Sequence, residues 1–158
     1  NFNSYEKKNY IPFFHNDFEK KLYSVFTSHK SIKQIKSKSI KSNENETGKF
    51  VEFLKHQNFG QISYLRCKTG QTRGLHYHHN KVENFLIVQG KAEFTYKNLL
   101  NNLTKKFKSS EKDNKIIQTI PGWAHKIKNI GKFDLIILIW SNEVFNKKKP
   151  DTYKYINL

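Results

Sequence analysis

The chain has little sulfur and no long apolar stretch. Its 158 residues include one cysteine and no methionine. Because a disulfide needs two cysteines, the lone Cys67 excludes an internal disulfide framework. The longest apolar run, Leu135 to Trp140, suits a buried strand and is far too short to cross a bilayer. The first ten residues carry no apolar segment typical of a signal peptide. We therefore expect a cytoplasmic protein that does not bind a membrane.

Acidic residues are also scarce, since 13 Asp and Glu stand against 29 Lys and Arg and give a formal net charge of +16. Such a balance can indicate nucleic-acid binding. Arginine, the preferred base-reading residue, is nearly absent, and no helix-turn-helix, zinc-finger or RRM signature is present. The abundance of Lys, Asn, Ile, Phe and Tyr is typical of an AT-rich genome. We therefore favour a small anionic substrate, such as a nucleotide diphosphate, over nucleic acid.

The N-terminal part of the chain has a helical pattern. Asn16, with Glu19 three positions later, is typical of a capping box, and apolar residues follow at helical spacing. We predict an amphipathic helix from His15 to about Ser28, whose apolar stripe packs on the core or on a second subunit. Residues 30–49 are rich in Lys, Ser and Asn, which indicates a surface connection.

From Phe50 onward, short apolar segments alternate with turn residues, a pattern typical of antiparallel strands. We predict strands at residues 50–55, 61–67, 75–78, 83–88, 92–96, 103–108, 116–120, 125–130 and 135–140. Strands at this spacing form a sandwich or a closed barrel, of which the small jelly roll is one solution. The expected fold class is mainly β, and the expected division is an N-terminal helix with a basic connecting segment at residues 1–48, and a barrel with a C-terminal tail at residues 49–158.

Histidines are concentrated in the segment GQTRGLHYHHNKVENFLIVQG, residues 70–90. On an extended strand His76 and His78 project from the same face, because side chains alternate with a period of two. Glu83 opens the next apolar segment and can point back at them from the neighbouring strand, and His125 follows in PGWAHKIKN. Imidazoles and a carboxylate suit a divalent transition metal such as zinc, iron, nickel or manganese. We therefore predict a metal site formed by His76, His78, Glu83 and His125.

The spacing of these residues matches the first signature of the cupin superfamily, G-x5-H-x-H-x4-E-x6-G, at every fixed position. The second signature, P-x-G-x2-H-x3-N, is met by Gly122, His125 and Asn129, with Ile120 in place of the usual proline. Beyond these signatures, the chain resembles the C-terminal cupin domain of the bacterial capsular-polysaccharide bifunctional UDP-sugar epimerase/reductase family. The segments that carry the resemblance are NDFEKKLYS, GKFVEFLK, RGLHYHHNKVENFLIVQGKAEF, HKIKNIG and WSNEVFNKKKPDTY.

This resemblance implies a cupin double-stranded β-helix, the small jelly-roll barrel, that binds zinc and acts as an epimerase. The implied substrate is a UDP-2-acetamido-4-keto-6-deoxy-hexose, epimerised at C-3 on the route to N-acetyl-L-fucosamine-type units of surface polysaccharides. In that family an NADPH-dependent reductase domain precedes the cupin, so we expect no reductase activity from this chain alone, with a reductase as a fused or separate partner. The resemblance also implies a homodimer.

The reaction requires removal of a proton beside a ketone and return of a proton to the other face. His79 and Tyr77 lie in the ligand segment and are candidate catalytic residues, although strict alternation directs both away from the metal ligands. Arg73 and Lys81 flank this segment and are candidates for binding the diphosphate. Trp123 is a candidate for stacking on uracil or sugar.

Three other functions stay open on the sequence. A nucleotide-sugar ketoisomerase would use the same enediol-type intermediate and move the keto group, which NMR of the product would reveal. A non-haem iron oxygenase would use two histidines and a carboxylate with open positions, and would consume oxygen. A non-catalytic sugar-binding cupin module would bind its ligand tightly without turnover.

Overall fold

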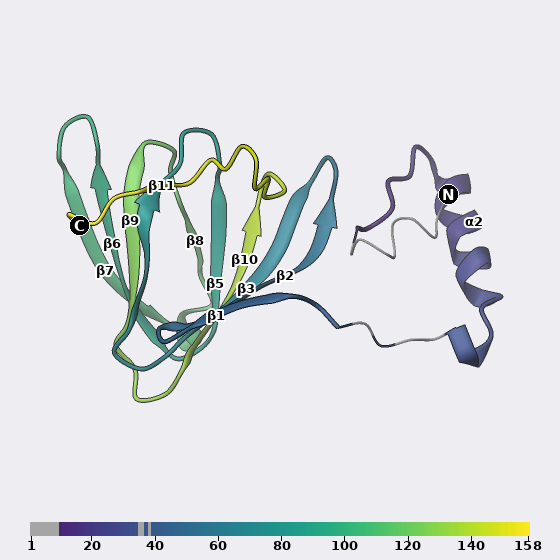
Figure 1. The fold of residues 1–158 in the computed structure, drawn as a ribbon, viewed down its shortest axis with the longest axis horizontal. Coiled ribbons are helices and arrows are strands. Elements are labelled where there is room, and N and C mark those ends of the chain that lie inside the picture. The colour runs from purple at the N-terminus through teal and green to yellow at the C-terminus, as the bar shows by residue number, and fades with distance from the viewer. Residues whose placement is uncertain (1–9, 35–36, 38) are drawn as a thin grey trace.

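The computed structural model describes residues 10–34, 37 and 39–158, and most of its regular structure is β (Figure 1). Helix α2 (Asp17–Ser28) and the short 3-10 helix η1 (Ile32–Gln34) come first, and a second 3-10 helix, η2 (Glu111–Asp113), interrupts the strands. The strands are β1 (Ser42–Asn45), β2 (Gly48–His56), β3 (Gly60–Cys67), β4 (Thr72–Tyr77), β5 (Glu83–Gln89), β6 (Lys91–Asn98), β7 (Thr104–Ser110), β8 (Ile116–Gln118), β9 (Trp123–Asn129), β10 (Leu135–Ser141) and β11 (Tyr153–Lys154).

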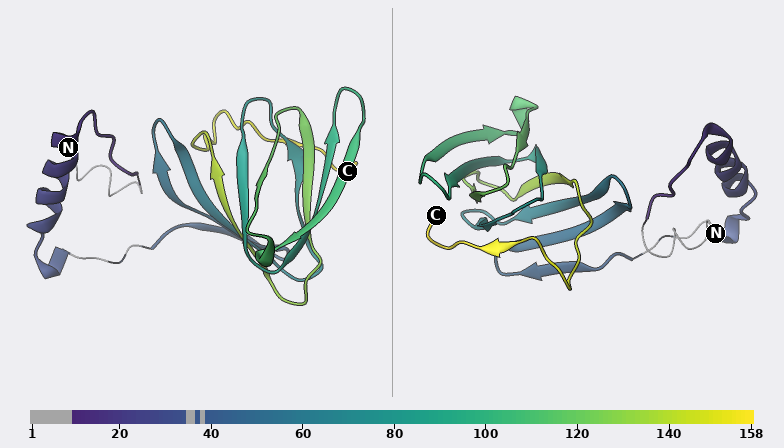
Figure 2. Two further views of the ribbon diagram at one scale, coloured as in Figure 1. Left: turned by 180° about the vertical axis from the view of Figure 1, so that it is seen from behind. Right: turned by 90° about the horizontal axis from the view of Figure 1, so that it is seen from above.

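The strands form two antiparallel sheets that enclose one core. One sheet has the order β1-β2-β3-β10-β5-β8 and the other β11-β4-β9-β6-β7. Figure 2 shows the two sheets wrapped around a common interior, with α2 standing away from them. Because β4 and β5 are consecutive in the chain but lie in different sheets, the segment between them crosses from one sheet to the other. The predicted mainly β barrel with an N-terminal helix is confirmed.

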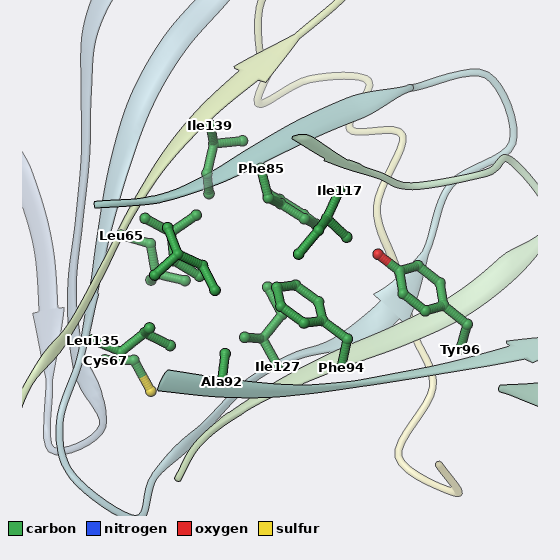
Figure 3. Packing of buried hydrophobic residues seen from close by; sticks show 12 residues of the cluster. Leu65, Cys67, Phe85, Ala92, Phe94, Tyr96, Ile117, Ile127, Leu135 and Ile139 are labelled. Atoms are coloured by element: carbon green, nitrogen blue, oxygen red, sulfur yellow. The ribbon is translucent and has the colours of Figure 1, made fainter. Parts of the chain in front are cut away.

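The core follows from strict alternation along the strands. In β10, Leu135, Ile137 and Ile139 are buried while Leu138 and Trp140 are partly exposed on the other face. The inward side chains of both sheets meet in one cluster, drawn in Figure 3, whose members are Leu65, Cys67, Phe85, Ile87, Ala92, Phe94, Tyr96, Ile117, Ile127, Leu135, Ile137 and Ile139. Burial of this apolar surface is what holds the two sheets together.

Each of the nine predicted strands has a counterpart in the structure, but two short strands were missed. β1 lies in the segment predicted as a surface connection, yet Ser42–Asn45 pairs with β2. Its sequence, SNEN, is exposed throughout and therefore has no apolar alternation to reveal it. β11, at Tyr153–Lys154, pairs with β4 and is only two residues long. The division at residue 48 stays a prediction.

Helix α2 begins as predicted. The Asn16 side chain accepts a hydrogen bond from the Glu19 backbone N–H at 2.9 Å, and the Glu19 carboxylate accepts one from the His15 N–H at 2.7 Å. The predicted packing of its apolar stripe on the core is wrong, because no residue of the helix is buried and Phe18 is 71% exposed. Contact with a second subunit stays a prediction. Among the described helices, none is long and apolar enough to cross a membrane.

Asn129, the last residue of β9, ties the end of the barrel together. It is 1% exposed, and its Nδ2 donates to the backbone carbonyls of Cys67 and Phe133, both at 2.9 Å. Its Oδ1 accepts a hydrogen bond from the Gly131 N–H at 2.9 Å. One buried amide therefore satisfies three backbone groups, from the end of β3 and from the connection between β9 and β10.

We predict that Asn129→Ala lowers the free energy of unfolding by ~1–3 kcal/mol, because it leaves buried backbone groups without partners. The matched control is Asn58→Ala, at an exposed position where the side chain makes no hydrogen bond among the described residues. Urea unfolding followed by circular dichroism measures both variants. Equal midpoints for Asn129→Ala and the unsubstituted protein would contradict the prediction.

Candidate metal centre

The structure brings the four predicted metal ligands together inside the barrel. His76 lies on β4, His125 on β9 and Glu83 at the start of β5, while His78 follows the end of β4. One ligand atom from each residue lies within 4.8 Å of those of the others. The ring centroids of His76 and His125 are 4.6 Å apart, and those of His76 and His78 are 4.8 Å apart. The predicted same-face arrangement of the His-x-His pair is therefore present.

Glu83 reaches the histidines by a different route from the one predicted. We expected the carboxylate on the neighbouring strand, but β5 belongs to the sheet opposite β4, so Glu83 faces the histidines across the barrel. Thr119 Oγ1 accepts a hydrogen bond from the Glu83 N–H at 2.8 Å, and Ser141 Oγ donates to the Glu83 carboxylate at 3.3 Å. Thr119 therefore anchors the Glu83 backbone, and Ser141 of β10 holds the carboxylate.

An irregularity in β4 turns His76 inward. The pairing of β4 with β9 shifts register between Gly74 and His76, and the intervening Leu75 has a φ of 60°, which is rare for a residue with a side chain. Gly74 has a φ of 89°, and a Cβ there would lie 2.8 Å from the carbonyl oxygen of His125. A glycine is therefore required where β4 approaches the strand that carries His125.

Hydrogen bonds determine which imidazole nitrogens face the site. Nδ1 of His76 donates to the Gly74 carbonyl at 3.1 Å, and Nδ1 of His78 donates to the Asp151 carbonyl. A carbonyl only accepts, so both rings carry their proton on Nδ1 and keep the Nε2 lone pair for a ligand. Metal-binding histidines almost always donate their other N–H to such a group.

Two further contacts fit a cation at this point. Glu83 Oε2 lies 3.3 Å from His78 Nε2 and 3.8 Å from His125 Nε2. Nδ1 of His125 is buried and has no hydrogen-bond partner among the described residues. Three imidazole nitrogens and one carboxylate oxygen directed at the same point are a donor set for a divalent transition metal. The residues present therefore fit a metal ion.

The protonation states also suit a metal. Burial lowers the pKa of His76 to about 4, with a smaller contribution from nearby His78, and burial lowers the pKa of His125 to about 3. Burial opposes ionisation of Glu83, but its hydrogen bond with His78 and the other imidazoles outweigh burial and lower its pKa to about 2. At neutral pH His76 and His125 are neutral and Glu83 is ionised, the forms that bind a cation.

The four ligands line a cavity of ≈ 260 Å³. Lys81 lines it as well, although its side chain is 6% exposed; its Nζ donates to Thr152 Oγ1 at 3.2 Å and lies 5.9 Å from the Phe145 ring centroid. Arg73 lines the other side, where its guanidinium donates to Thr47 Oγ1 at 2.7 Å and to Asn45 Oδ1 at 3.1 Å. Within the part of the chain that the structure describes, neither cation forms an ion pair.

The C-terminal segment supplies a residue that the sequence did not reveal. Both carboxylate oxygens of Asp151 accept hydrogen bonds from the backbone, with His79 N–H at 2.9 Å, Asn80 N–H at 2.7 Å and Lys81 N–H at 2.8 Å. Burial raises the pKa of Asp151, but these three hydrogen bonds outweigh burial and hold the pKa below its usual value. Together with its carbonyl bond to His78, Asp151 fixes the whole ligand loop at residues 78–81.

The other predicted site residues lie outside this cavity. Tyr77 and His79 pack against Tyr153 of β11, with ring centroids 5.3 and 4.6 Å from it, and neither lines the cavity. Trp123 lies at the start of β9 and lines a different hollow. Conversely, Glu52 of β2 lines the metal cavity and was not predicted. The pairing of β2 with β3 shifts register just after Glu52, an irregularity that strict alternation does not anticipate.

Comparison with known proteins places this site in a family. Residues 43–153 match the family described as the polysaccharide biosynthesis C-terminal domain. The UDP-2-acetamido-2,6-beta-L-arabino-hexul-4-ose reductase of Pseudomonas aeruginosa is 38% identical over 132 residues, which are 84% of this chain and 35% of that protein. The capsular polysaccharide assembling protein CapF of Staphylococcus aureus superposes with a TM-score of 0.90 at 32% identity, covering 98% of this chain and 42% of that chain.

More distant structures share the fold. An oxalate decarboxylase of Lactobacillus farciminis superposes with a TM-score of 0.57 at 22% identity, covering 79% of this chain and 40% of that chain. At this identity the likeness shows the fold alone, and with the CapF match it confirms the predicted cupin fold. The chain spans about a third of the curated relative and less than half of the solved chains described above.

We predict that the protein binds about one equivalent of divalent metal and that the double variant His76→Ala, His125→Ala loses it, because two of four donors are removed. The control is His15→Ala, at an exposed histidine outside the cluster. Elemental analysis by mass spectrometry of the dialysed proteins measures the metal. The ligand assignment fails if the double variant keeps its metal or if the unsubstituted protein binds none.

We also predict a pH-dependent effect of Asp151→Asn. A carboxylate whose pKa is lowered by folding stabilises the folded state above its ordinary pKa of ~4, and this stabilisation disappears as the pH falls through the lowered value. The variant should therefore lose ~1–2 kcal/mol of unfolding free energy at pH 7 and progressively less below pH ~4. Urea unfolding at pH 7 and below pH ~4 measures the loss of unfolding free energy, with Asp17→Asn, at an exposed position, as the control. An equal loss of unfolding free energy at both pH values would contradict a stabilising role of the Asp151 carboxylate.

Proposed function

The chain belongs to the polysaccharide biosynthesis C-terminal domain family, and from this we propose that it is a metal-dependent epimerase of a nucleotide-linked keto sugar. The proposed substrate is a UDP-2-acetamido-4-keto-6-deoxy-hexose, used to make N-acetyl-L-fucosamine-type units of a surface polysaccharide. The observation that carries the proposal is the convergence of three histidines and a carboxylate in a cavity that also holds two cations without ion-pair partners among the described residues.

The names of the relatives support the substrate class. The Pseudomonas aeruginosa relative is named as a reductase of a UDP-linked 2-acetamido-hexul-4-ose, and the Staphylococcus aureus relative as a capsular polysaccharide assembling protein. Since this chain matches only 35% of the reductase, we do not extend the reductase activity to it. The proposal is instead an isomerase reaction beside the ketone of such a sugar.

We propose that the resident metal is zinc, held by His76, His78, Glu83 and His125. Zinc has no redox chemistry and accepts nitrogen and oxygen donors of this kind. When bound, the metal supplies a Lewis acid that stabilises negative charge on a ketone oxygen. The chain itself keeps His76 and His125 neutral at neutral pH, because their pKa values are lowered to about 4 and about 3.

Arg73 and Lys81 are proposed to bind the diphosphate. Both line the cavity, and both are held by neutral oxygen acceptors, Asn45 and Thr47 for Arg73 and Thr152 for Lys81. A burial as deep as that of Lys81 is costly for a charged group that lacks an anionic partner. A phosphate oxygen would supply the missing negative charge, so the two residues support an anionic sugar nucleotide as the proposed substrate.

Proton removal is proposed to fall to Glu52. The reaction breaks the C–H bond beside the ketone: the base takes the proton, and the electron pair stays in an enolate. Water then supplies a proton to the same carbon from the opposite face, and the base releases its own proton to solvent. Glu52 and Glu83 are the two carboxylates that line the cavity, and Glu83 is a metal ligand in this assignment. Glu52, whose Oε2 forms an ion pair with Lys55 Nζ at 2.7 Å, therefore remains as the carboxylate proposed to accept the proton. Because His79 and Tyr77 do not line the cavity, the proposal no longer assigns them this role.

In heavy water, we predict that the protein incorporates deuterium at the carbon beside the ketone of the UDP-4-keto-sugar, and that Glu52→Gln slows this exchange by ~10²–10⁴-fold, the usual contribution of a general base. The exchange is followed by NMR, which also identifies the product.

The control is Glu111→Gln, an exposed carboxylate outside the cavity, which should leave the rate unchanged. Metal content should be unaltered in Glu52→Gln, because Glu52 is not a ligand. No deuterium incorporation in the metal-loaded protein would exclude the epimerase, and a shifted keto group in the product would instead identify a ketoisomerase.

A further inference from the structure

A second hollow, here called the lysine groove, lies between β6, β7 and β8 and shares no residue with the metal cavity. Its volume of ≈ 590 Å³ is within the range of small-molecule sites, ~300–1,000 Å³. The residues that line it are Tyr96, Lys105, Phe107, Lys108, Ser109, Lys115, Ile116, Ile117, Gln118, Ile120 and Trp123. Among them is Trp123, a predicted substrate-binding residue that the metal cavity leaves unused.

The charge of the groove has one sign. Lys105, Lys108 and Lys115 line it, and none of the other described residues that line it is acidic. In the described ranges none of the three lysines forms an ion pair within 4.0 Å, although Lys115 contributes to lowering the pKa of nearby Asp113. Several cations along one hollow create a positive field that attracts an anion with several charges.

Aromatic rings form the walls between these lysines. Phe107 stacks on Tyr96, with ring centroids 5.9 Å apart and planes 3° from parallel, and Lys105 Nζ lies 5.9 Å from the Phe107 centroid. Trp123, partly buried, lines the same hollow. Flat aromatic surfaces favour stacking with a planar ring, and a nucleobase offers one whatever its sequence identity.

Tyr96 gives an independent sign that a ligand belongs here. Its side chain is 5% exposed, and its hydroxyl has no hydrogen-bond partner among the described residues. Figure 3 shows this hydroxyl directed from β6 toward Ile117, another residue that lines the groove. A buried hydroxyl without a partner is rare in folded proteins and indicates that a polar group from outside completes it.

We propose that the lysine groove binds a nucleoside diphosphate, at a site separate from the metal cavity. The aromatic walls take the base, the lysines take the two phosphates, and the Tyr96 hydroxyl donates a hydrogen bond to the ligand. Tyr96 faces His125 across the β6–β9 pair, with ring centroids 6.0 Å apart. Because paired residues project from the same face of a sheet, the nucleotide would lie against the residue that neighbours this metal ligand.

The chain contains two tryptophans, which makes the proposal directly testable. Trp140 lies in another hollow, beside Phe59, so Trp140→Phe leaves Trp123 as the sole reporter in the groove. In this background, titration with UDP should quench the Trp123 fluorescence to saturation, whereas uridine without phosphates should bind more weakly. The quench should persist in protein stripped of metal by a chelator, because the metal cavity does not contribute to the groove.

Charge reversal supplies the matched comparison. Lys105→Glu with Lys115→Glu should weaken UDP binding by roughly tenfold or more, because two phosphate contacts become repulsive. Lys106→Glu with Lys112→Glu changes the net charge equally at exposed lysines outside the groove and should leave the affinity nearly unchanged. Absence of quenching, or an equal loss of affinity in both pairs, would overturn the proposal. The deuterium exchange assay reports on the metal cavity separately, so the two proposals can fail independently.

Discussion

The rest of the barrel depends on the contacts around the Glu83 carboxylate. A charge in a protein interior is stable only when it is paired and hydrogen-bonded, and here three imidazoles and the Ser141 hydroxyl lie around the carboxylate. These groups come from both sheets, so the two sheets are joined by polar as well as apolar contacts. The apolar core cluster contributes to the burial that lowers the pKa values of His76 and His125. The core thereby keeps both imidazoles neutral and able to bind a cation.

Much of the fold could be predicted from the sequence, because the strands show a local alternation of apolar and polar residues. The nine predicted strands and the grouping of His76, His78 and Glu83 depend on residues a few positions apart, where the period of two is reliable. His125 lies far downstream and was found through the second cupin signature. The features that were missed depend on contacts between distant segments. Asp151 binds a loop that precedes it by about seventy positions, and Glu52 turns inward at a register shift in β2. Neither arrangement leaves a pattern in its own neighbourhood.

The excess of lysine also divides into two parts in the structure. Arg73 and Lys81 lie in the metal cavity, where no described residue gives them an anionic partner, and three further lysines line the groove beside Trp123. In the proposed view both hollows take phosphate groups, one from a substrate and one from a free nucleotide. The net charge of the sequence suggested an anionic ligand, but net charge does not say where the cations lie. Only the fold shows which cations line which hollow. The homodimer stays a prediction, to which the exposed apolar stripe of α2 gives a surface.

The clamp formed by Asp151 has a consequence for the order of events during synthesis. The chain leaves the ribosome from its N-terminal side, so His76, His78, Glu83 and His125 all emerge before Asp151. Until then the loop at residues 78–81 lacks the carboxylate that binds its three N–H groups, and His78 lacks the carbonyl that holds its Nδ1 proton. All four ligand residues are therefore present before Asp151 can fix the loop that carries His78. A nascent chain would meet metal ions with a loose site first, and the final segment, drawn in yellow across the barrel in Figure 1, would tighten it.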